Sequence, residues 1–185
     1  LDVPVGSFCG LVGPNGSGKT TTLRMIAGLL RPDAGRVWVG GHDTWAEPVE
    51  VRRLLGVVPD PLNLFDRLSA RELFGHLGAA LLHRPAVLLL DEPFEGVDPV
   101  SAVAVRTILD RYRHAGGTVV FSSHAMDLVD RMCDVVAVMV DGALLASGPI
   151  EALRGGGRLE DAFISMVGAD PVDPASVAWL DRPTP

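Results

Sequence analysis

The sequence predicts an α/β fold in which helices flank a mostly parallel sheet, with a small antiparallel β part. Short apolar runs such as residues 86–90 and 135–140 alternate along the chain with segments whose apolar residues recur at helical spacing. Strands that alternate with helices are typical of layered folds built on parallel sheets. A length of 185 residues, 48% of them hydrophobic and 21% charged, is sufficient for one domain with a sizeable core.

Composition excludes several classes of protein. The apolar runs are much shorter than the roughly 20 residues that a membrane-spanning helix needs. Cys9 and Cys133 are far apart and outside any CxxC pattern, which argues against a disulfide framework or a structural zinc site and favours the cytosol. Sixteen basic against 23 acidic residues give a net charge of −7 without a basic run. We therefore expect no nucleic-acid partner.

The first elements surround a glycine-rich loop. Residues 5–12 predict a strand that leads into this loop, and apolar residues at helical spacing between 23 and 30 predict the helix that leaves it. Residues 36–39 predict a strand that ends in the tight turn Gly40-Gly41. Residues 54–58 predict another short strand.

The later elements continue the alternation. They are, in chain order, a helix at 69–82, a strand at 86–90, a helix from 99 to about 113, a strand at 118–122, a helix at 125–132, and strands at 135–140 and 143–146. Ser69 and Glu72 form a capping-box pattern, and Asp98-Pro99 supplies a cap and a first-turn proline. We assign residues 1–168 to one domain and residues 169–185, which are rich in proline, to a flexible or docking tail.

The glycine-rich loop has the pattern GxxxxGK[ST] between a predicted strand and a predicted helix. Backbone N–H groups of such a loop and of the first helical turn wrap phosphates, helped by the helix dipole. Lys19, the only lysine among 16 basic residues, is placed to reach the β and γ phosphates, and the Thr20 hydroxyl suits Mg²⁺. The predicted nucleotide-binding residues are Gly13, Pro14, Asn15, Gly16, Ser17, Gly18, Lys19, Thr20 and Thr21.

Two adjacent carboxylates follow the apolar strand at 86–90. Asp91 and Glu92 stand at the end of this strand, where open α/β sheets place their ligands. We expect Asp91 to hold Mg²⁺ through water and Glu92 to accept a proton from the attacking water.

These motifs resemble the ATP-binding cassette (ABC) family. The phosphate loop resembles its Walker A motif, residues 87–92 its Walker B motif with the catalytic glutamate, and residues 96–99 its D-loop. His124 resembles the switch histidine, and Asp98 a residue at the dimer contact. Over residues 1–168, the sequence between the motifs is also similar to that of ATPases of multidrug and antibiotic exporters of the ABC-2 type.

The chain departs from the family pattern at three places. Asp60 stands where the family has a glutamine, so we expect it to approach Mg²⁺ through water. The early strand whose aromatic residue stacks on adenine lies before Leu1 in the family pattern, so no adenine-stacking residue is assigned. The helical subdomain with the signature motif, on the order of 50 residues in relatives, is missing near residues 78–82. Either an encoded segment is absent from the printed sequence, which we expect, or the chain lacks it.

The resemblance implies an enzyme that binds and hydrolyses ATP with Mg²⁺. Its expected partners are a second copy of the nucleotide-binding domain and a separate transmembrane permease subunit, and its expected location is the inner face of the cell membrane. A chain without the signature motif is expected to bind nucleotide but to hydrolyse it poorly. Two alternatives are a soluble ABC-type ATPase not involved in transport and another P-loop NTPase such as a small-molecule kinase.

Overall fold

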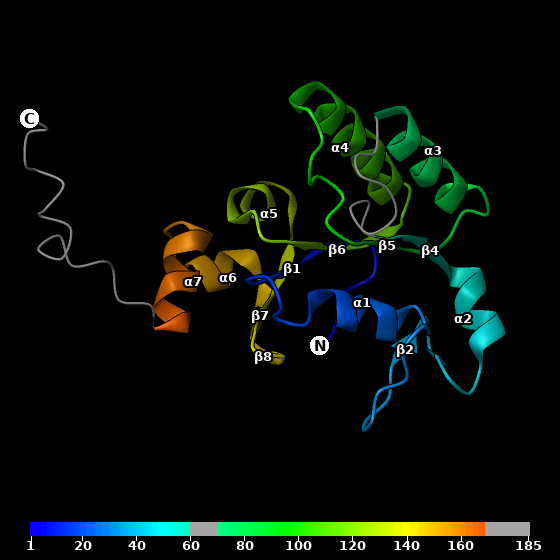
Figure 1. Ribbon diagram of the computed structural model, residues 1–185, viewed down its shortest axis with the longest axis horizontal. Helices are drawn as coiled ribbons and strands as arrows, with labels where there is room; N and C mark the ends of the chain where they lie inside the picture. The colour runs from blue at the N-terminus through cyan, green and yellow to red at the C-terminus, as the bar shows by residue number, and fades with distance from the viewer. Residues whose placement is uncertain (60–69, 169–185) are drawn as a thin grey trace, which may run out of the picture.

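A computed structural model describes residues 1–59 and 70–168 (Figure 1). Its main sheet contains six strands and a second, small sheet contains two. The strands are β1 (Phe8–Val12), β2 (Trp38–Val39), β3 (His42–Asp43), β4 (Leu55–Val58), β5 (Val87–Leu90), β6 (Thr118–Ser123), β7 (Val135–Val140) and β8 (Ala143–Pro149). The helices are α1 (Lys19–Ile26), α2 (Pro48–Leu54), α3 (Ala70–Leu81), α4 (Pro99–His114), α5 (Met126–Met132), α6 (Ile150–Arg154) and α7 (Leu159–Val167).

The main sheet has the strand order β4-β5-β6-β1-β7-β8. All neighbours are parallel except β7 and β8, which form a hairpin, and the small β2–β3 sheet is antiparallel. Both neighbours of β1 come from the second half of the chain, with Val12 opposite Ser123 on one side and Val138 on the other. The carboxyl ends of the parallel strands therefore lie at one edge of the sheet.

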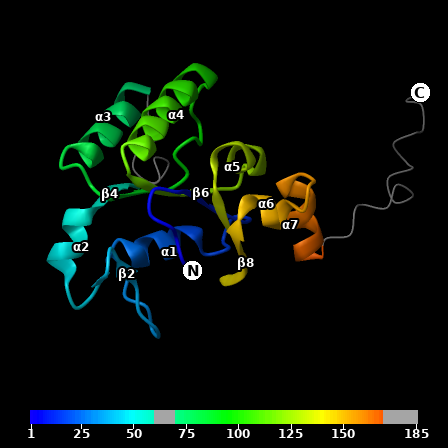
Figure 2. The same cartoon turned by 180° about the vertical axis from the view of Figure 1, so that it is seen from behind.

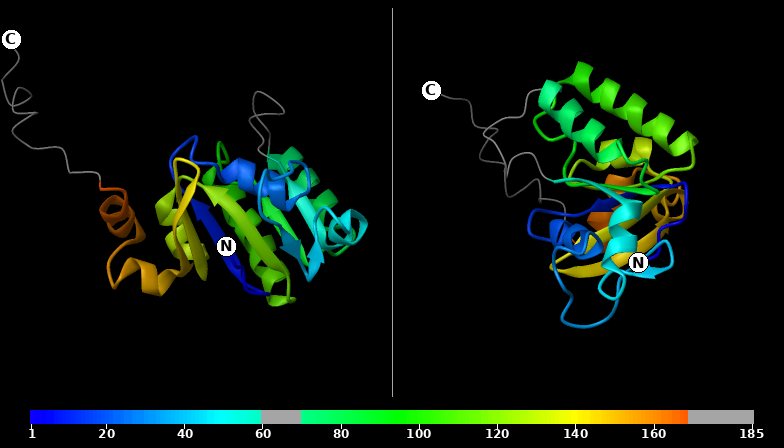
Figure 3. Two further views of the ribbon diagram at one scale, coloured as in Figure 1. Left: turned by 90° about the horizontal axis from the view of Figure 1, so that it is seen from below. Right: turned by 90° about the vertical axis from the view of Figure 1, so that its right-hand side faces the viewer.

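Helices cover both faces of this sheet (Figures 1 and 2). The helices α3, α4 and α5 lie on one face, and α1 lies on the other, while the end-on view in Figure 3 shows the sheet between these layers. Alternate residues of β1 enter different cores, because Phe8 and Val12 pack toward the first set of helices and Leu11 packs toward α1. Gly10 has no side chain where α5 lies closest, and a Cβ there would lie 2.7 Å from Val129.

The predicted α/β fold with a mostly parallel sheet and a small antiparallel part is confirmed. The first strand is shorter than predicted and begins at Phe8, because Ser7 closes a turn onto Pro4 and Gly6 has a positive φ of 75°. The last strand is longer than predicted, because β8 pairs with β7 as far as Pro149. The helices α2, α6 and α7 were not predicted. Ser69 of the predicted capping box and residues 169–185 of the predicted tail lie outside the described residues.

Helix α3 runs without a break through residues 78–81 and ends there, inside the junction at residues 78–82. Its last turn closes on Leu81, and the N–H of Arg84 donates to the Leu81 carbonyl in the short link to β5. Arg84 takes a left-handed conformation in this link, with φ 52°. The chain on the two sides of the junction thus joins without a gap in the fold.

The two cysteines are free and buried, one in β1 and the other after α5. Burial raises the pKa of the Cys9 thiol to about 12 and raises that of Cys133 as well. Both thiols therefore stay protonated at neutral pH, as expected for cysteines with a packing role. No helix among residues 1–59 and 70–168 is long and apolar enough to cross a membrane.

Candidate functional site

The predicted site residues gather at the carboxyl edge of the sheet. The phosphate loop follows β1, the two adjacent carboxylates follow β5, and His124 follows β6. Because β6 lies between β1 and β5, the loop and the carboxylates follow strands that are two strand spacings apart, about 10 Å. Ligands of open parallel sheets bind at this edge.

The loop between β1 and α1 depends on glycine at two positions. A Cβ at Gly13 would lie 2.0 Å from the carbonyl oxygen of Met139 in β7, so only glycine allows this close approach. Gly18 precedes α1 in the left-handed conformation, with φ 98°. It provides no side-chain cap, so no side chain of the cap position occupies the N–H groups at the start of α1. Those groups are available to an anion.

Lys19 lies inside this loop and is only 6% exposed. Its Nζ donates to the carbonyl oxygens of Gly13, at 2.8 Å, and Pro14, at 3.2 Å. The same Nζ lies 3.7 Å from Oε1 of Glu92, whose side chain is 12% exposed. The single lysine of the chain therefore joins the phosphate loop to the carboxylates that follow β5.

Thr20 and Asp91 meet although 71 residues separate them in sequence. The Thr20 hydroxyl donates to Oδ1 of Asp91 at 3.0 Å. The hydroxyl of Ser122 in β6 donates to the same oxygen at 2.6 Å and accepts from the backbone N–H of Glu92 at 2.8 Å. A hydroxyl and a carboxylate at this spacing are oxygen donors of the kind that Mg²⁺ prefers.

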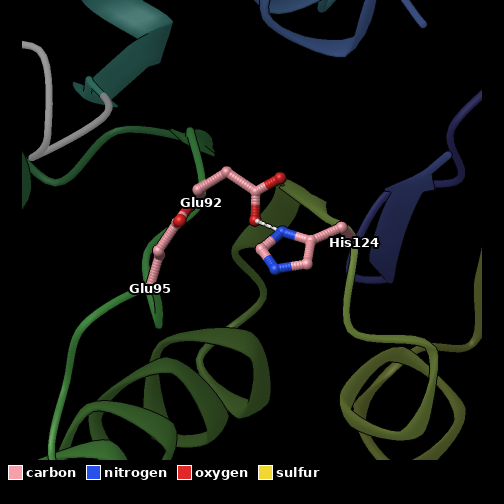
Figure 4. A group of neighbouring side chains, drawn as sticks. All are labelled: Glu92, Glu95 and His124. Atoms are coloured by element: carbon pink, nitrogen blue, oxygen red, sulfur yellow. Dashed lines mark hydrogen bonds and ion pairs between the residues drawn. The ribbon is translucent and has the colours of Figure 1, made fainter. Parts of the chain in front are cut away.

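Glu92 and His124 are in contact (Figure 4). Nδ1 of His124 lies 3.2 Å from Oε2 of Glu92, a hydrogen bond in which the imidazole donates its proton. Glu92 has a φ of 44°, an uncommon left-handed conformation for a residue with a side chain. The other oxygen of its carboxylate faces Lys19, so this side chain lies between the phosphate loop and His124.

Asp98 has a local structural contact that its sequence pattern predicts. Its Oδ1 accepts from the N–H groups of Val100 and Ser101, both at 3.0 Å, so it caps α4. Its Oδ2 accepts from the Ser101 hydroxyl at 2.5 Å, and this hydrogen bond is the largest cause of the lowered pKa of the Asp98 carboxyl. Asp60 lies outside the described residues.

Ser122 is the site residue that sequence reasoning missed. It was predicted only as the last residue of a buried strand, whereas its hydroxyl binds both Asp91 and the Glu92 backbone. A serine directly after the apolar run Val119–Phe121, at the carboxyl end of the strand, was the available signal. Its importance depends on β6 lying beside β5, which the order of elements along the chain does not reveal.

The assembled geometry suits the binding of a nucleoside triphosphate. A loop with free N–H groups and one buried lysine can hold phosphates. A threonine and an aspartate can share a divalent cation, and a carboxylate next to an imidazole can receive a proton from water. These groups are the ones that phosphoryl transfer to water requires.

Comparison with known proteins also points to an ATP-binding protein. The family model described as "ABC transporter" matches residues 1–73. The chain is 31% identical to the ABC transporter ATP-binding protein NatA of Bacillus subtilis, with 87% of this chain and 84% of NatA covered. It is 33% identical to the daunorubicin/doxorubicin resistance ATP-binding protein DrrA of Streptomyces peucetius, with 83% of this chain and 60% of DrrA covered.

Solved structures share the fold. An ATP-binding subunit of an ABC transporter superimposes with a TM-score of 0.74 at 21% identity, and the match covers 88% of this chain and 89% of that one. An ATP-binding cassette solved as a post-hydrolysis dimer with ADP and Pi gives a TM-score of 0.68 at 22% identity, over 81% of this chain and 88% of that one. With the identity to NatA, the chain belongs to the ATP-binding proteins of ABC transporters, a family of ATPases.

Proposed function

We propose that this chain is the ATP-hydrolysing subunit of an ABC exporter. The observation that carries this proposal is the pair of contacts between motifs 71 to 73 residues apart, Thr20 with Asp91 and Lys19 with Glu92. These contacts bring phosphate-binding and carboxylate groups from two strands close enough to act on one bound molecule. Similarity to NatA and DrrA supports this reading and gives no support to a small-molecule kinase.

In this proposal the loop from Gly13 to Thr21 holds the phosphates of ATP. Lys19 exchanges its contacts with the Gly13 and Pro14 carbonyls for the β and γ phosphates, which are stronger partners because they are charged. Thr20 and Asp91 hold Mg²⁺, which neutralises charge on the phosphates when it is bound. Ser122 fixes the orientation of the Asp91 carboxylate.

Glu92 is the residue that we assign as the general base, which accepts the proton from the attacking water. Its backbone N–H is held by Ser122 and its carboxylate by Lys19 and His124, so its position is fixed from three sides. When Lys19 turns to phosphate, one carboxylate oxygen becomes free to accept from water. His124 then orients the other oxygen.

We further propose that two copies of the nucleotide-binding domain, residues 1–168, close around nucleotide and drive a separate membrane permease. The name of DrrA supports export as the direction of transport, and such a partner places the chain at the inner face of the cell membrane. Asp98 at the start of α4 is the residue assigned to the contact between copies.

In this proposal the segment with the signature motif belongs in this chain at residues 78–82, and it faces the nucleotide held by the second copy. Because 87% of this chain is about 161 residues, the 207 aligned positions include about 46 of NatA without a counterpart here. That number agrees with the segment of about 50 residues expected at the junction. Protein without this segment is proposed to bind ATP but to hydrolyse it poorly.

The test uses protein that carries the segment, with Glu92→Gln as the variant. The amide keeps the shape of the side chain but cannot take a proton, so ATP binding is kept, phosphate release falls by at least about a hundredfold, and an ATP-bound dimer accumulates. Phosphate release and size exclusion with ATP and Mg²⁺ measure both effects. Glu151→Gln, on the exposed surface of α6, is the control. Full turnover by Glu92→Gln would refute the assignment.

A further inference from the structure

The turn between β5 and α4 contains a second glutamate that the proposed reaction does not use. The backbone N–H of Glu95 donates to the Glu92 carbonyl at 3.1 Å, which closes the turn and brings the two glutamates to one side of it. His124 approaches the same place from the end of β6 (Figure 4). One ligand atom from each of Glu92, Glu95 and His124 lies within 4.8 Å of the other two.

These three side chains form a donor set for zinc. Carboxylate oxygens and imidazole nitrogens are both zinc ligands, and zinc held by three protein ligands keeps a fourth position for water. Zinc ligands at roughly 2.0–2.2 Å from the metal are about 3.3 Å apart. Nδ1 of His124 already lies 3.2 Å from Oε2 of Glu92, so the distance that remains is from Glu95 to these two atoms, and the three rotatable bonds of the Glu95 side chain can close it.

Mg²⁺ is a poor occupant of the same place. Magnesium prefers octahedral oxygen ligands and keeps several waters, whereas an imidazole nitrogen favours zinc and other transition metals. The predicted magnesium ligands Thr20 and Asp91 face the phosphate loop and are not members of this group. Among residues 1–59 and 70–168, no other set of three His, Cys, Asp or Glu side chains meets the same distance.

The charge around the group also favours a cation. The two glutamates carry two negative charges and Asp91 adds a third beside them, while Lys19 at 3.7 Å from Glu92 supplies one positive charge. Lys19 faces Oε1 of Glu92 and His124 faces Oε2, so a metal at Oε2 leaves the lysine contact in place. Nucleotide-free protein therefore has room for the ion without losing the structure of its phosphate loop.

We propose that Glu92, Glu95 and His124 form a Zn²⁺ site in the nucleotide-free protein, and that Zn²⁺ bound there inhibits ATP hydrolysis. The metal replaces the hydrogen bond between Nδ1 of His124 and Oε2 of Glu92: the imidazole proton moves to Nε2, and Nδ1 and Oε2 become ligands together with a carboxylate oxygen of Glu95. Binding of the metal follows from the three ligands alone. Inhibition rests on the proposed function, because it requires Glu92 to act as the base.

The experiment titrates Zn²⁺ into metal-free protein without nucleotide, in competition with a chromophoric chelator. Co²⁺ serves as a second probe, because its visible absorption reports nitrogen and oxygen ligands. We expect one ion per chain, an affinity at least about tenfold lower in Glu95→Gln and in His124→Gln, and loss of the Co²⁺ band in both. His42→Gln is the matched control, because His42 contacts Glu47 at 3.0 Å without a third ligand and should change the affinity by less than about twofold.

The outcomes separate this inference from the proposed function. Equal Zn²⁺ affinity in wild type and Glu95→Gln, or loss of binding in His42→Gln instead, would overturn the metal site. Binding of a fluorescent ATP analogue is measured on the same preparations. Protein that binds ATP but not Zn²⁺ would contradict the metal site and leave the proposed function intact. Protein that binds Zn²⁺ at these residues but not ATP would support the metal site and contradict the proposed function. Zinc binding without slower phosphate release would overturn the inhibitory part.

Discussion

Lys19 has the most concentrated set of interactions of any side chain in the site. It is buried, contacts two loop carbonyls and pairs with Glu92. All of these partners belong to the protein itself, so the lysine is held in place without a ligand. A side chain that is already ordered loses little further rotational freedom on binding.

Replacing Lys19 by alanine is expected to remove nucleotide affinity. Hydrogen bonds to charged groups contribute about 1.5–3 kcal/mol each, so losing those to two phosphates lowers affinity by on the order of a hundredfold or more. Lys19→Arg should fail as well, because a planar guanidinium does not fit the space of a compact ammonium. Binding of a fluorescent ATP analogue to the three proteins measures this. Unchanged affinity in Lys19→Ala would remove the phosphate site from this loop.

Ser122 is expected to contribute more to stability than an ordinary serine. Its hydroxyl is fully buried and bridges Asp91 and the Glu92 N–H, so Ser122→Ala leaves both groups short of a partner. The free energy of unfolding should fall by about 1–3 kcal/mol, measured in urea. Thr107→Ala, at an exposed position of α4, is the control and should be close to neutral. Equal stability of Ser122→Ala and wild type would contradict the bridge.

At the level of elements, the charge of the Asp98 carboxylate, which caps the start of α4, makes the stability of the fold depend on pH. Hydrogen bonds from Ser101 lower the pKa of the Asp98 carboxyl in the folded protein, relative to about 3.9 in an unfolded chain. The cap therefore stabilises the fold fully above that value, and its contribution is lost as the pH falls through the lower folded pKa.

The corresponding prediction compares Asp98→Ala with wild type in urea at several pH values. Wild type should have the higher unfolding midpoint at pH 7, and the difference should shrink steadily below about pH 4. Asp98→Asn keeps an acceptor oxygen at every pH and should show no such trend relative to alanine. A wild-type advantage that is the same at pH 7 and pH 3 would mean that the charge of Asp98 is not what the cap uses.

The elements also explain which parts of the site could be predicted from the sequence. The loop residues up to Thr20 and the pair Asp91-Glu92 are contiguous in sequence, and local glycine and strand patterns were sufficient to find them. Ser122 and Glu95 depend on which strand lies beside β5 and on how one turn closes. Those are long-range facts that no local pattern contains. Helix α2 was missed because its first apolar residues, Val49 and Val51, alternate with Glu50, a spacing that is not typical of a helix.

At the level of the whole molecule, the question at residues 78–82 is whether the protein contains the segment with the signature motif. The intact mass of the protein produced from its own gene is expected to be several kilodaltons above 19.6 kDa, because an encoded segment is expected there. Mass spectrometry measures this directly. A mass equal to 19.6 kDa would show that the chain lacks the segment, and such protein should bind ATP as a monomer without cooperative hydrolysis.

The place of β1 in the sheet has a consequence for how the molecule is made. The strand that delivers the phosphate loop leaves the ribosome well before its two partners in the sheet, because β6 and β7 begin more than 100 residues later in the chain. Contacts of such long sequence separation form slowly, because a large loop must close before they are made. During synthesis β1 and the turn around Lys19 therefore lack their neighbouring strands in the sheet until β7 has left the ribosome. The phosphate loop is thus translated long before the strands that hold it, and it can take its folded form only after β7 has been translated.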